Sequence, residues 1–233
     1  MKAFLLAAGE GTRLRPITLG TPKCLVPIRG VPVLAIWLRQ CRELGIDEIL
    51  INVHWHADAV RQFLKQSDYG IKIDIVEEQF LLGSAGTLRA NREWVIGEES
   101  FWIFYADVLN QADLHAMARL HRLRRPIATL GVCRVPDPTR CGIVSTCADG
   151  VIDQFVEKPR QPVGNLAFSG LMIGTPALLD AIPNQVPVDI GFHVLPKLAG
   201  QMIAFPINDF LIDIGTMDNY QRAQETWPGF STP

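Results

Sequence analysis

Two spacings of apolar residues alternate along the first half of the chain, and this alternation limits the fold more than any other feature. Short runs rich in Ile, Val and Phe have the length of strands, and the segments between them repeat apolar residues at helical spacing. The predicted strands cover residues 3–7, 48–53, 71–76, 101–106 and 127–135, and the predicted helices cover residues 32–44, 57–65, 85–95 and 112–124. This alternation predicts βαβ units around a largely parallel sheet.

The pattern changes after about residue 136. Runs at 141–147 and 151–156 flank Ala148-Asp149-Gly150, which predicts a hairpin that turns at Asp-Gly. The other predicted strands cover residues 166–173, 203–206 and 210–214, and the other predicted helices cover residues 175–182, 190–198 and 217–226. Since no repeat or linker interrupts the chain, we predict a single α/β domain over residues 1–233. Its Rossmann-like, doubly wound half (1–135) continues into a mixed-sheet extension (136–233).

The segment after the first predicted strand, LLAAGEGTRLRPITLGTPKCLVPI, admits three interpretations: an export signal, an ordinary surface loop or a cradle for phosphates. The export signal is rejected because the apolar stretch 3–8 ends after six residues at Gly9, too early for such a signal. No apolar run approaches the roughly 20 residues that span a bilayer. We therefore expect a cytoplasmic protein without a membrane partner.

Charge and cysteine content exclude further classes of function. The chain has 22 Lys and Arg against 24 Asp and Glu, a net charge of -2, so it carries no overall electrostatic footprint for nucleic acid. The basic run 119–125 is interpreted as a solvated helix face. The five cysteines are an odd number without a C-x-x-C motif, which argues against a disulfide framework or a zinc site. His54 and His56 form an H-x-H pair that lacks an evident third zinc ligand.

The interpretation of the glycine-rich segment as a phosphate cradle rests on its position. In open α/β sheets, ligands bind beyond the carboxyl ends of the strands, and residues 9–13 follow directly on such an end. Glycines permit close backbone approach, consecutive N–H groups form an anion-binding nest, and Arg13 offers a charged fork. The segment lacks the third glycine of G-x-G-x-x-G and the G-K-[ST] of a P-loop. A turn that merely needs glycine remains the alternative.

The continuation of the segment resembles the signature of the sugar-nucleotide pyrophosphorylases, L-x-A-G-x-G-T-R-L-x-P-x-T followed by P-K-x-L-x-P. The matching residues are Leu6, Ala8, Gly9, Gly11, Thr12, Arg13, Leu14, Pro16, Thr18, Pro22, Lys23, Leu25 and Pro27. The resemblance implies the nucleotide-diphospho-sugar transferase fold, with residues 1–135 as the nucleotide-binding half and residues 136–233 as the sugar-binding half.

Two further motifs extend this resemblance in the first half. Residues 82–88, LGSAGTL, resemble the L-G-T-A-G-x-L loop that holds the nucleotide base at a helix N-terminus. The alternative is a plain helix entry with Ser84 as its cap. The strand 101–106 ends at Ala106-Asp107, where the family usually has Gly-Asp and the acid binds Mg²⁺. Asp107 as the cap of a turn is the alternative.

Two more motifs lie in the second half. Glu157-Lys158-Pro159 resembles the family's E-K-P, in which the acid holds sugar hydroxyls and the lysine holds the sugar's phosphate. Pro159 predicts an extended Lys158 whose side chain points away from that of Glu157, and a solvated surface pair is the alternative. Residues 168–171 resemble a sugar loop in which Gly170 fits, and residues 210–216 resemble W-x-D-I-G-T, which assigns a second acid, Asp213. Capping of the last helix is the alternative role for Asp213.

The resemblance assigns roles residue by residue. The nucleotide-binding residues are Leu6, Ala7, Ala8, Gly9, Glu10, Gly11, Thr12, Arg13, Lys23, Gly83, Ala85, Gly86 and Ala106, and the sugar-phosphate residues are Glu157, Lys158 and Gly170. Asp107 and Asp213 are the expected Mg²⁺ ligands. They form the expected catalytic set with Arg13, Lys23 and Lys158.

The implied reaction joins a nucleoside triphosphate to a sugar 1-phosphate and releases pyrophosphate. The phosphate nucleophile is already anionic near pH 7, so the reaction needs no general base. The compact mannose- or heptose-1-phosphate guanylyltransferases are the most similar subgroup, and uridylyltransferases of N-acetylmuramate 1-phosphate are the alternative. Outside this reaction class, a sugar-nucleotide sensor remains open, and the missing third glycine disfavours a dinucleotide-dependent oxidoreductase. The sequence is compatible with a homo-oligomer and leaves the oligomeric state open.

Overall fold

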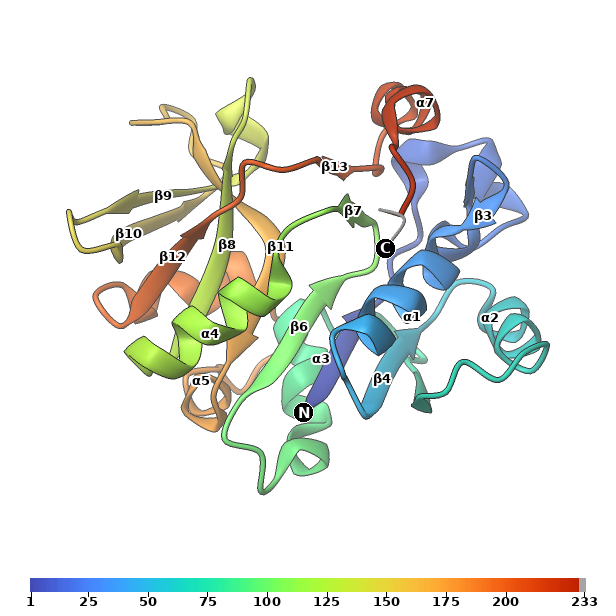
Figure 1. Ribbon diagram of the computed structural model, residues 1–233, viewed down its shortest axis with the longest axis horizontal. Helices are drawn as coiled ribbons and strands as arrows, with labels where there is room; N and C mark the ends of the chain where they lie inside the picture. Colours follow the sequence, from blue (N-terminus) through green and yellow to red (C-terminus); the bar gives the residue numbers. More distant parts are fainter. Residues whose placement is uncertain (231–233) are drawn as a thin grey trace.

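The computed structural model describes residues 1–230 of the chain, which form a nine-stranded mixed sheet with helices on both faces (Figure 1). The strand order is β5-β4-β1-β6-β11-β8-β12-β10-β9. The α/β fold class and the doubly wound mixed sheet are thereby confirmed. No helix in residues 1–230 is both long and apolar enough to cross a membrane.

The predicted βαβ units form the first half of the sheet. The strands β1 (Lys2–Leu6), β4 (Glu48–Val53), β5 (Lys72–Glu77) and β6 (Phe101–Tyr105) pair in parallel with one another in the order β5-β4-β1-β6. The connecting helices are α1 (Val33–Glu43), α2 (Ala57–Leu64) and α3 (Ser84–Ala90), followed by the 3₁₀ turn η4 (Arg92–Val95). The predicted apolar face of α1 is confirmed, since Leu34, Trp37, Leu38 and Cys41 are buried.

The predicted mixed-sheet extension is confirmed in the second half, although the place of its strands in the sheet was not predicted. The strand β8 (Ala128–Arg134) does not lie beside β6, because β11 (Leu166–Gly174) is inserted between them and is antiparallel to both. β12 (Met202–Pro206) is parallel to β8, and β10 (Val151–Glu157) pairs with β9 (Gly142–Thr146) as the predicted hairpin. A strand from the second half of the chain, β11, therefore lies in the middle of the sheet.

Several short elements escaped sequence prediction. The strands β2 (Pro27–Ile28) and β3 (Val31–Pro32), which pair with each other, and β7 (Val108–Asn110) were not predicted. The strand β7 pairs with β13 (Leu211–Asp213), which lies within the predicted strand 210–214. The predicted helix 190–198 divides into α6 (Ile190–His193) and η6 (Leu195–Leu198). The remaining helices are α4 (Leu114–Arg124), α5 (Pro176–Asp180) and α7 (Met217–Thr226), and the remaining 3₁₀ turns are η1 (Thr12–Leu14), η2 (Ile17–Leu19), η3 (Lys23–Leu25) and η5 (Pro138–Arg140).

The core has two layers because side chains alternate across each strand. Along β1, Ala3 and Leu5 enter one buried cluster, which includes α1 and α4 residues, whereas Phe4 enters the other, which includes α3 and α5 residues. Burial of each large apolar side chain contributes roughly 1.5–3 kcal/mol. Both layers end near the carboxyl ends of β1, β4 and β6, where polar side chains begin.

Candidate active site

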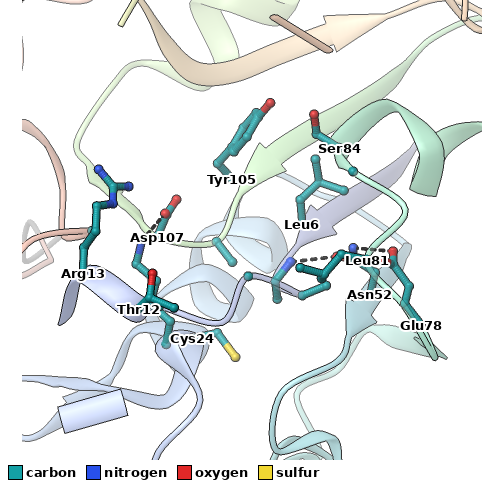
Figure 2. A pocket seen from close by; sticks show the side chains of 18 residues that line it. Leu6, Thr12, Arg13, Cys24, Asn52, Glu78, Leu81, Ser84, Tyr105 and Asp107 are labelled. Carbon is teal, nitrogen blue, oxygen red and sulfur yellow. Dashed lines mark hydrogen bonds and ion pairs between the residues drawn. The ribbon is translucent and has the colours of Figure 1, made fainter. Parts of the chain in front are cut away.

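A cavity of about 350 Å³ opens at the carboxyl ends of β1, β4 and β6 (Figure 2). Its lining brings together most of the predicted nucleotide-binding residues with several residues that the sequence did not single out. The lining residues are Leu6, Ala7, Ala8, Gly9, Gly11, Thr12, Arg13, Lys23, Cys24, Asn52, Glu78, Leu81, Gly83, Ser84, Tyr105, Ala106, Asp107 and Gly215. Other predicted residues, namely Glu10, Ala85, Gly86, Glu157, Lys158, Gly170 and Asp213, lie outside this lining.

The turn after β1 needs glycine for two physical reasons. Gly11 has a φ of 65°, in the left-handed region, and a Cβ placed there would lie 2.9 Å from Cγ2 of Thr18. The Thr18 hydroxyl donates a hydrogen bond of 2.8 Å to the Gly11 carbonyl, and this bond stabilises the turn. Within residues 1–230, no protein acceptor takes up the N–H groups of Gly9, Glu10 and Gly11. These donors suit an anion.

Asp107 and Asp213 meet because β7 and β13 pair. In this antiparallel pair Asp213 lies opposite Val108, and the Ile214 N–H donates to the Asp107 carbonyl at 3.0 Å. Asp107 directly precedes β7 and Asp213 ends β13, so two acids separated by about half the chain come to one place.

The Lys23 ammonium joins the two acids. Its Nζ donates to Oδ2 of Asp107 and lies 3.9 Å from Oδ1 of Asp213. The pKa of Asp213 is raised, first by loss of hydration in its surroundings and then by the neighbouring Asp107 charge. Lys23, the Gly215 N–H and Arg13 oppose that rise. The nearby cations therefore stabilise the charged form of Asp213, which is half-exposed and lies beside another acid.

Gly215 is a site residue that sequence reasoning missed, although it stands in the D-I-G-T motif. A Cβ at this position would lie 2.7 Å from Oδ1 of Asp213, 2.9 Å from Nζ of Lys23 and 3.1 Å from Nη2 of Arg13. The Gly215 N–H also donates to Asp213 Oδ1 at 2.6 Å. Three predicted catalytic side chains therefore converge on the space that the missing side chain leaves.

The donor set of this acid pair fits Mg²⁺. Asp107 and Asp213 offer hard carboxylate oxygens, and the Lys23 ammonium between them acts as a stand-in cation. In the part of the chain that the structure describes, no three His, Cys, Asp or Glu side chains cluster as metal ligands. Further ligands would come from substrate phosphates and water, as is usual for Mg²⁺. The rings of His54 and His56 contact the backbone carbonyls of Glu78 and Leu19 instead of forming part of a metal cluster.

A buried polar network closes the opposite end of the cavity, on the right of Figure 2. Oδ1 of Asn52 accepts from the Ala7 N–H at 2.7 Å, and Nδ2 of Asn52 donates to Glu78 Oε1 at 2.8 Å and to Thr87 Oγ1 at 3.0 Å. Oε2 of Glu78 accepts from the Leu82 N–H at 3.0 Å. The network was missed, but Asn52 within the apolar run ILINV was a detectable signal.

The loop 82–86 is joined to the backbone around Val188. Gly83 has φ 80° and ψ 161°, and a Cβ there would lie 2.4 Å from the Val188 carbonyl oxygen. That carbonyl accepts from the N–H groups of Ala85 and Gly86 at 2.9 and 3.1 Å. Ser84 is not the helix cap, because its hydroxyl donates to Asp189 Oδ2 and accepts from the Ile190 N–H. These bonds connect the loop to the second half of the chain.

The predicted extended conformation of Lys158, with its side chain pointing away from that of Glu157, is wrong. Its φ is 47°, in the left-handed region, and its Nζ lies 3.6 Å from Glu157 Oε1 and 5.3 Å from the centre of the Phe192 ring. The Lys158 N–H donates to the Cys141 carbonyl at 2.9 Å, and this tertiary bond accompanies a conformation that Pro159 disfavours locally. The two side chains thus face each other.

Glu157 and Gly170 occupy confined positions. A Cβ at Gly142 or Gly191 would lie 2.6 or 2.3 Å from Glu157 Oε2, so both glycines make room for this carboxylate. Burial, more than any other cause, raises the pKa of Glu157. Gly170 is buried where the register of β11 shifts, with a φ of 83°, and faces Tyr105 and Val108.

A family model described as Nucleotidyl transferase matches residues 2–228. The chain belongs to the nucleotidyl transferase family. It is 34% identical over 221 residues to the mannose-1-phosphate guanylyltransferase catalytic subunit beta of Xenopus tropicalis, covering 92% of this chain and 61% of that protein. It is 32% identical over 227 residues to mannose-1-phosphate guanylyltransferase 1 of Arabidopsis thaliana, covering 94% and 63%. The chain thus spans about three fifths of the length of these curated relatives.

Solved structures support the fold assignment. A candidate glucose-1-phosphate thymidylyltransferase from Bacillus anthracis superimposes with a TM-score of 0.88 at 22% identity, covering 100% of this chain and 97% of that one. A UDP-glucose pyrophosphorylase from Acinetobacter baumanii gives a TM-score of 0.82 at 22% identity, covering 96% and 91%. At this identity the likeness establishes a shared nucleotide-diphospho-sugar transferase architecture.

Proposed function

We propose that the chain transfers a nucleoside monophosphate from a nucleoside triphosphate to a sugar 1-phosphate, yielding a nucleoside diphosphate sugar and pyrophosphate. The observation that carries this proposal is the convergence of Lys23, Arg13 and the Asp107–Asp213 pair at one end of a cavity that begins with a glycine turn. Membership of the nucleotidyl transferase family supports it.

The chemistry calls for positioning and charge neutralisation. The sugar phosphate is the nucleophile, and its oxygen attacks the α-phosphorus while pyrophosphate leaves in line. The N–H groups of residues 9–11 and the Arg13 fork bind the leaving phosphates, and Lys23 lies where the α-phosphate and the sugar phosphate approach each other. Asp107 and Asp213 would hold Mg²⁺, which would further neutralise phosphate charge.

The second half of the chain supplies the sugar side in this proposal. The Glu157 carboxylate accepts hydrogen bonds from sugar hydroxyls, and the Lys158 ammonium binds the phosphate of the sugar. Gly170 belongs to the loop that contacts the sugar. The confinement of Glu157 between Gly142 and Gly191 supports a fixed orientation of its carboxylate. The residues 1–135 then bind the nucleotide and the residues 136–233 bind the sugar phosphate, within one cytoplasmic domain.

GTP with mannose 1-phosphate is the substrate pair we favour, since the curated relatives are named mannose-1-phosphate guanylyltransferases. Heptose 1-phosphate with GTP, and N-acetylmuramate 1-phosphate with UTP, are the alternatives. A panel of ATP, CTP, GTP and UTP, each tested with these sugar phosphates and followed by pyrophosphate release, tests the reaction and ranks the substrates. A protein that binds sugar nucleotides but releases no pyrophosphate with any pair would instead be a sensor.

Two substitutions test the assigned roles. Asp213→Ala and Lys23→Ala should keep the fold and lower turnover by about 10²–10³-fold, the scale of removing one charge-stabilising contact. Asp209→Ala is the matched control, because Asp209 is exposed and lies four residues before Asp213. Steady-state rates with circular dichroism spectra provide the measurement, and wild-type turnover in either site variant contradicts the assignment.

A further inference from the structure

We propose that Lys23 is an exchangeable cation: its ammonium neutralises the Asp107–Asp213 pair in the nucleotide-free protein and transfers to phosphate when nucleotide and metal bind. This inference rests on the proposed function and extends it to the order of binding. It predicts that the divalent cation binds poorly until triphosphate is present, because the lysine and the metal compete for the same two carboxylates.

The first argument is where the ammonium lies. Lys23 is 8% exposed, yet its Nζ contacts Asp107 Oδ2 and lies 3.9 Å from Asp213 Oδ1, facing the cavity that it lines. A metal ion that bridges these carboxylates binds their oxygens at 2.0–2.1 Å in the case of Mg²⁺. Such an ion would lie close to the ammonium, and two cations in one partly desolvated place repel each other.

The second argument is that the stem of the lysine is fixed by its contacts whereas its end lies at the cavity. Its backbone belongs to η3 after Pro22, its carbonyl accepts from the Val26 N–H at 3.2 Å, and its Cβ packs against the turn at Gly11. A Cβ at Gly215 would lie 2.9 Å from Nζ, so the ammonium occupies its place only because residue 215 has no side chain. Lys23 also lines the cavity, so rotation of its outer side-chain bonds would bring the ammonium to a phosphate bound there while the stem stays in place.

The third argument is the charge balance of the site. With Lys23 on the acids, the pair is only half neutralised by direct contact, and Arg13 lies beside it. A divalent cation neutralises both carboxylates but leaves the lysine without a partner. Triphosphate supplies that partner within the same cavity, so metal and nucleotide each improve the binding of the other.

The test measures Mn²⁺ binding without any nucleotide, from the EPR signal of free Mn²⁺. Mn²⁺ accepts the same carboxylate ligands as Mg²⁺. Lys23→Gln should bind Mn²⁺ at least tenfold more tightly than the wild type, and adding Asp213→Asn to that variant should abolish the gain. Equal affinities in the wild type and Lys23→Gln overturn the proposal, as does a gain that survives Asp213→Asn.

A measurement on the wild type covers the case in which Lys23→Gln does not fold. Amine-selective labelling, quantified by peptide mass spectrometry against the exposed Lys197, should rise at least threefold at Lys23 on saturation with Mn²⁺. A non-hydrolysable triphosphate added with Mn²⁺ should suppress labelling again. If labelling of Lys23 does not change when Mn²⁺ is added, the proposed exchange is overturned.

These measurements separate the inference from the proposed reaction. An active protein with equal Mn²⁺ affinities overturns only the exchange. A protein that releases no pyrophosphate but shows the tenfold difference overturns only the reaction.

Discussion

At the scale of single residues, missing side chains organise the site as much as charged ones do. Gly215 leaves the space into which Asp213, Lys23 and Arg13 all point, and Gly11 lets the glycine turn after β1 pack on Thr18. The three atoms nearest to a methyl group at Gly215 would be the ends of these side chains. Its effect therefore falls on their geometry and not on the fold.

We expect Gly215→Ala to lower kcat/KM by about 100-fold, because a displacement of about 1 Å in catalytic groups has an effect of that order. The free energy of unfolding should change by less than about 1 kcal/mol, since the displaced atoms are side-chain ends. Steady-state kinetics and urea unfolding measure the two quantities.

The matched control is Gly20→Ala, at a position where a new Cβ meets nothing within 4 Å. It should leave kcat/KM unchanged. Full activity in Gly215→Ala would show that the three side chains tolerate displacement and would contradict the assigned convergence.

At the scale of elements, short irregular segments join the two halves of the chain at the cavity. The β7–β13 pair brings the two acids together, and the loop 82–86 bonds to Val188 through three backbone hydrogen bonds of 2.8 to 3.1 Å. Gly83 adopts backbone angles that are essentially restricted to glycine, and a Cβ there would lie 2.4 to 2.9 Å from backbone atoms of Val188.

Gly83→Ala should therefore lower the free energy of unfolding by about 2–4 kcal/mol, through backbone strain together with overpacking against Val188. Urea denaturation measures this loss. Nucleotide affinity should also fall, because Gly83 lines the cavity. Gly97→Ala is the control, since Gly97 also has positive φ but open space around its Cβ position, so it isolates the strain. Equal losses in the two variants would refute the contact with Val188.

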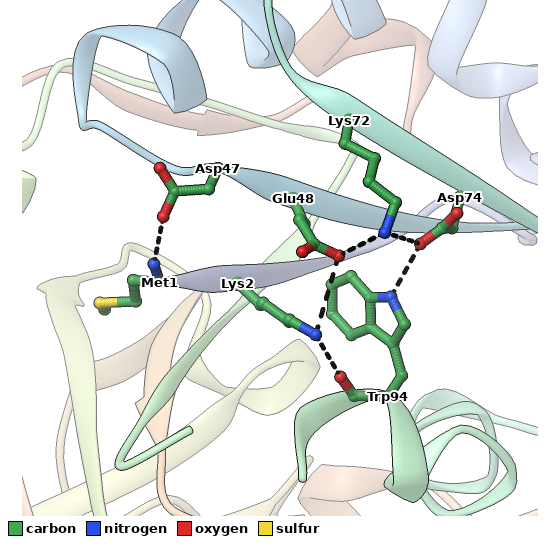
Figure 3. Close-up of polar contacts among 7 residues, drawn as sticks. All are labelled: Met1, Lys2, Asp47, Glu48, Lys72, Asp74 and Trp94. Atoms are coloured by element: carbon green, nitrogen blue, oxygen red, sulfur yellow. Dashed lines mark hydrogen bonds and ion pairs between the residues drawn. The ribbon is translucent and has the colours of Figure 1, made fainter. Parts of the chain in front are cut away.

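At the scale of the whole molecule, the two ends of the parallel strands have different roles. Opposite the cavity, a polar network joins the amino ends of β1, β4 and β5 to η4 (Figure 3). Lys2 donates to the Trp94 carbonyl, Lys72 donates to Glu48, and the Trp94 indole donates to Asp74. The hydrogen bond from Lys72 holds the pKa of Glu48 below its ordinary value. The stabilisation that the charged Glu48 provides is therefore present above about pH 4.5 and is lost as the pH falls further.

The same end of the sheet contains a buried histidine that links stability to pH. His121 on α4 is 4% exposed, and its Nδ1 hydrogen-bonds Thr129 Oγ1 on β8 at 2.9 Å. Burial, with a smaller contribution from Arg122, lowers its pKa from 6.5 to about 4. The unfolded chain therefore binds a proton between these two pH values when the folded protein does not, and stability falls as the pH falls through that window.

We expect His121 to account for a loss of about 3 kcal/mol in the free energy of unfolding between pH 7.5 and pH 4. Urea unfolding across this range should show a correspondingly smaller loss in His121→Gln than in the wild type. His115→Gln, at an exposed position on the same helix, should behave like the wild type. Parallel pH profiles for all three proteins would contradict the assignment.

Local sequence determined much of this protein. The helices and strands of the first half, the hairpin at 149–150 and the apolar face of α1 follow from residue spacing, which acts within a few neighbours. The position of the glycine turn after β1 and most of the cavity lining also follow, because the carboxyl ends of parallel strands form ligand crevices. The five assigned catalytic residues stand in recognisable sequence motifs, and their roles remain predictions.

Tertiary structure alone decided the rest. The insertion of β11 between β6 and β8, the meeting of Asp107 with Asp213, and the left-handed Lys158 all depend on pairings between residues far apart in the chain. Local spacing does not encode such pairings, since their free energy comes from burial and hydrogen bonds that form only when distant segments meet. The buried Asn52–Glu78–Thr87 network and the space at Gly215 belong to this second class for the same reason.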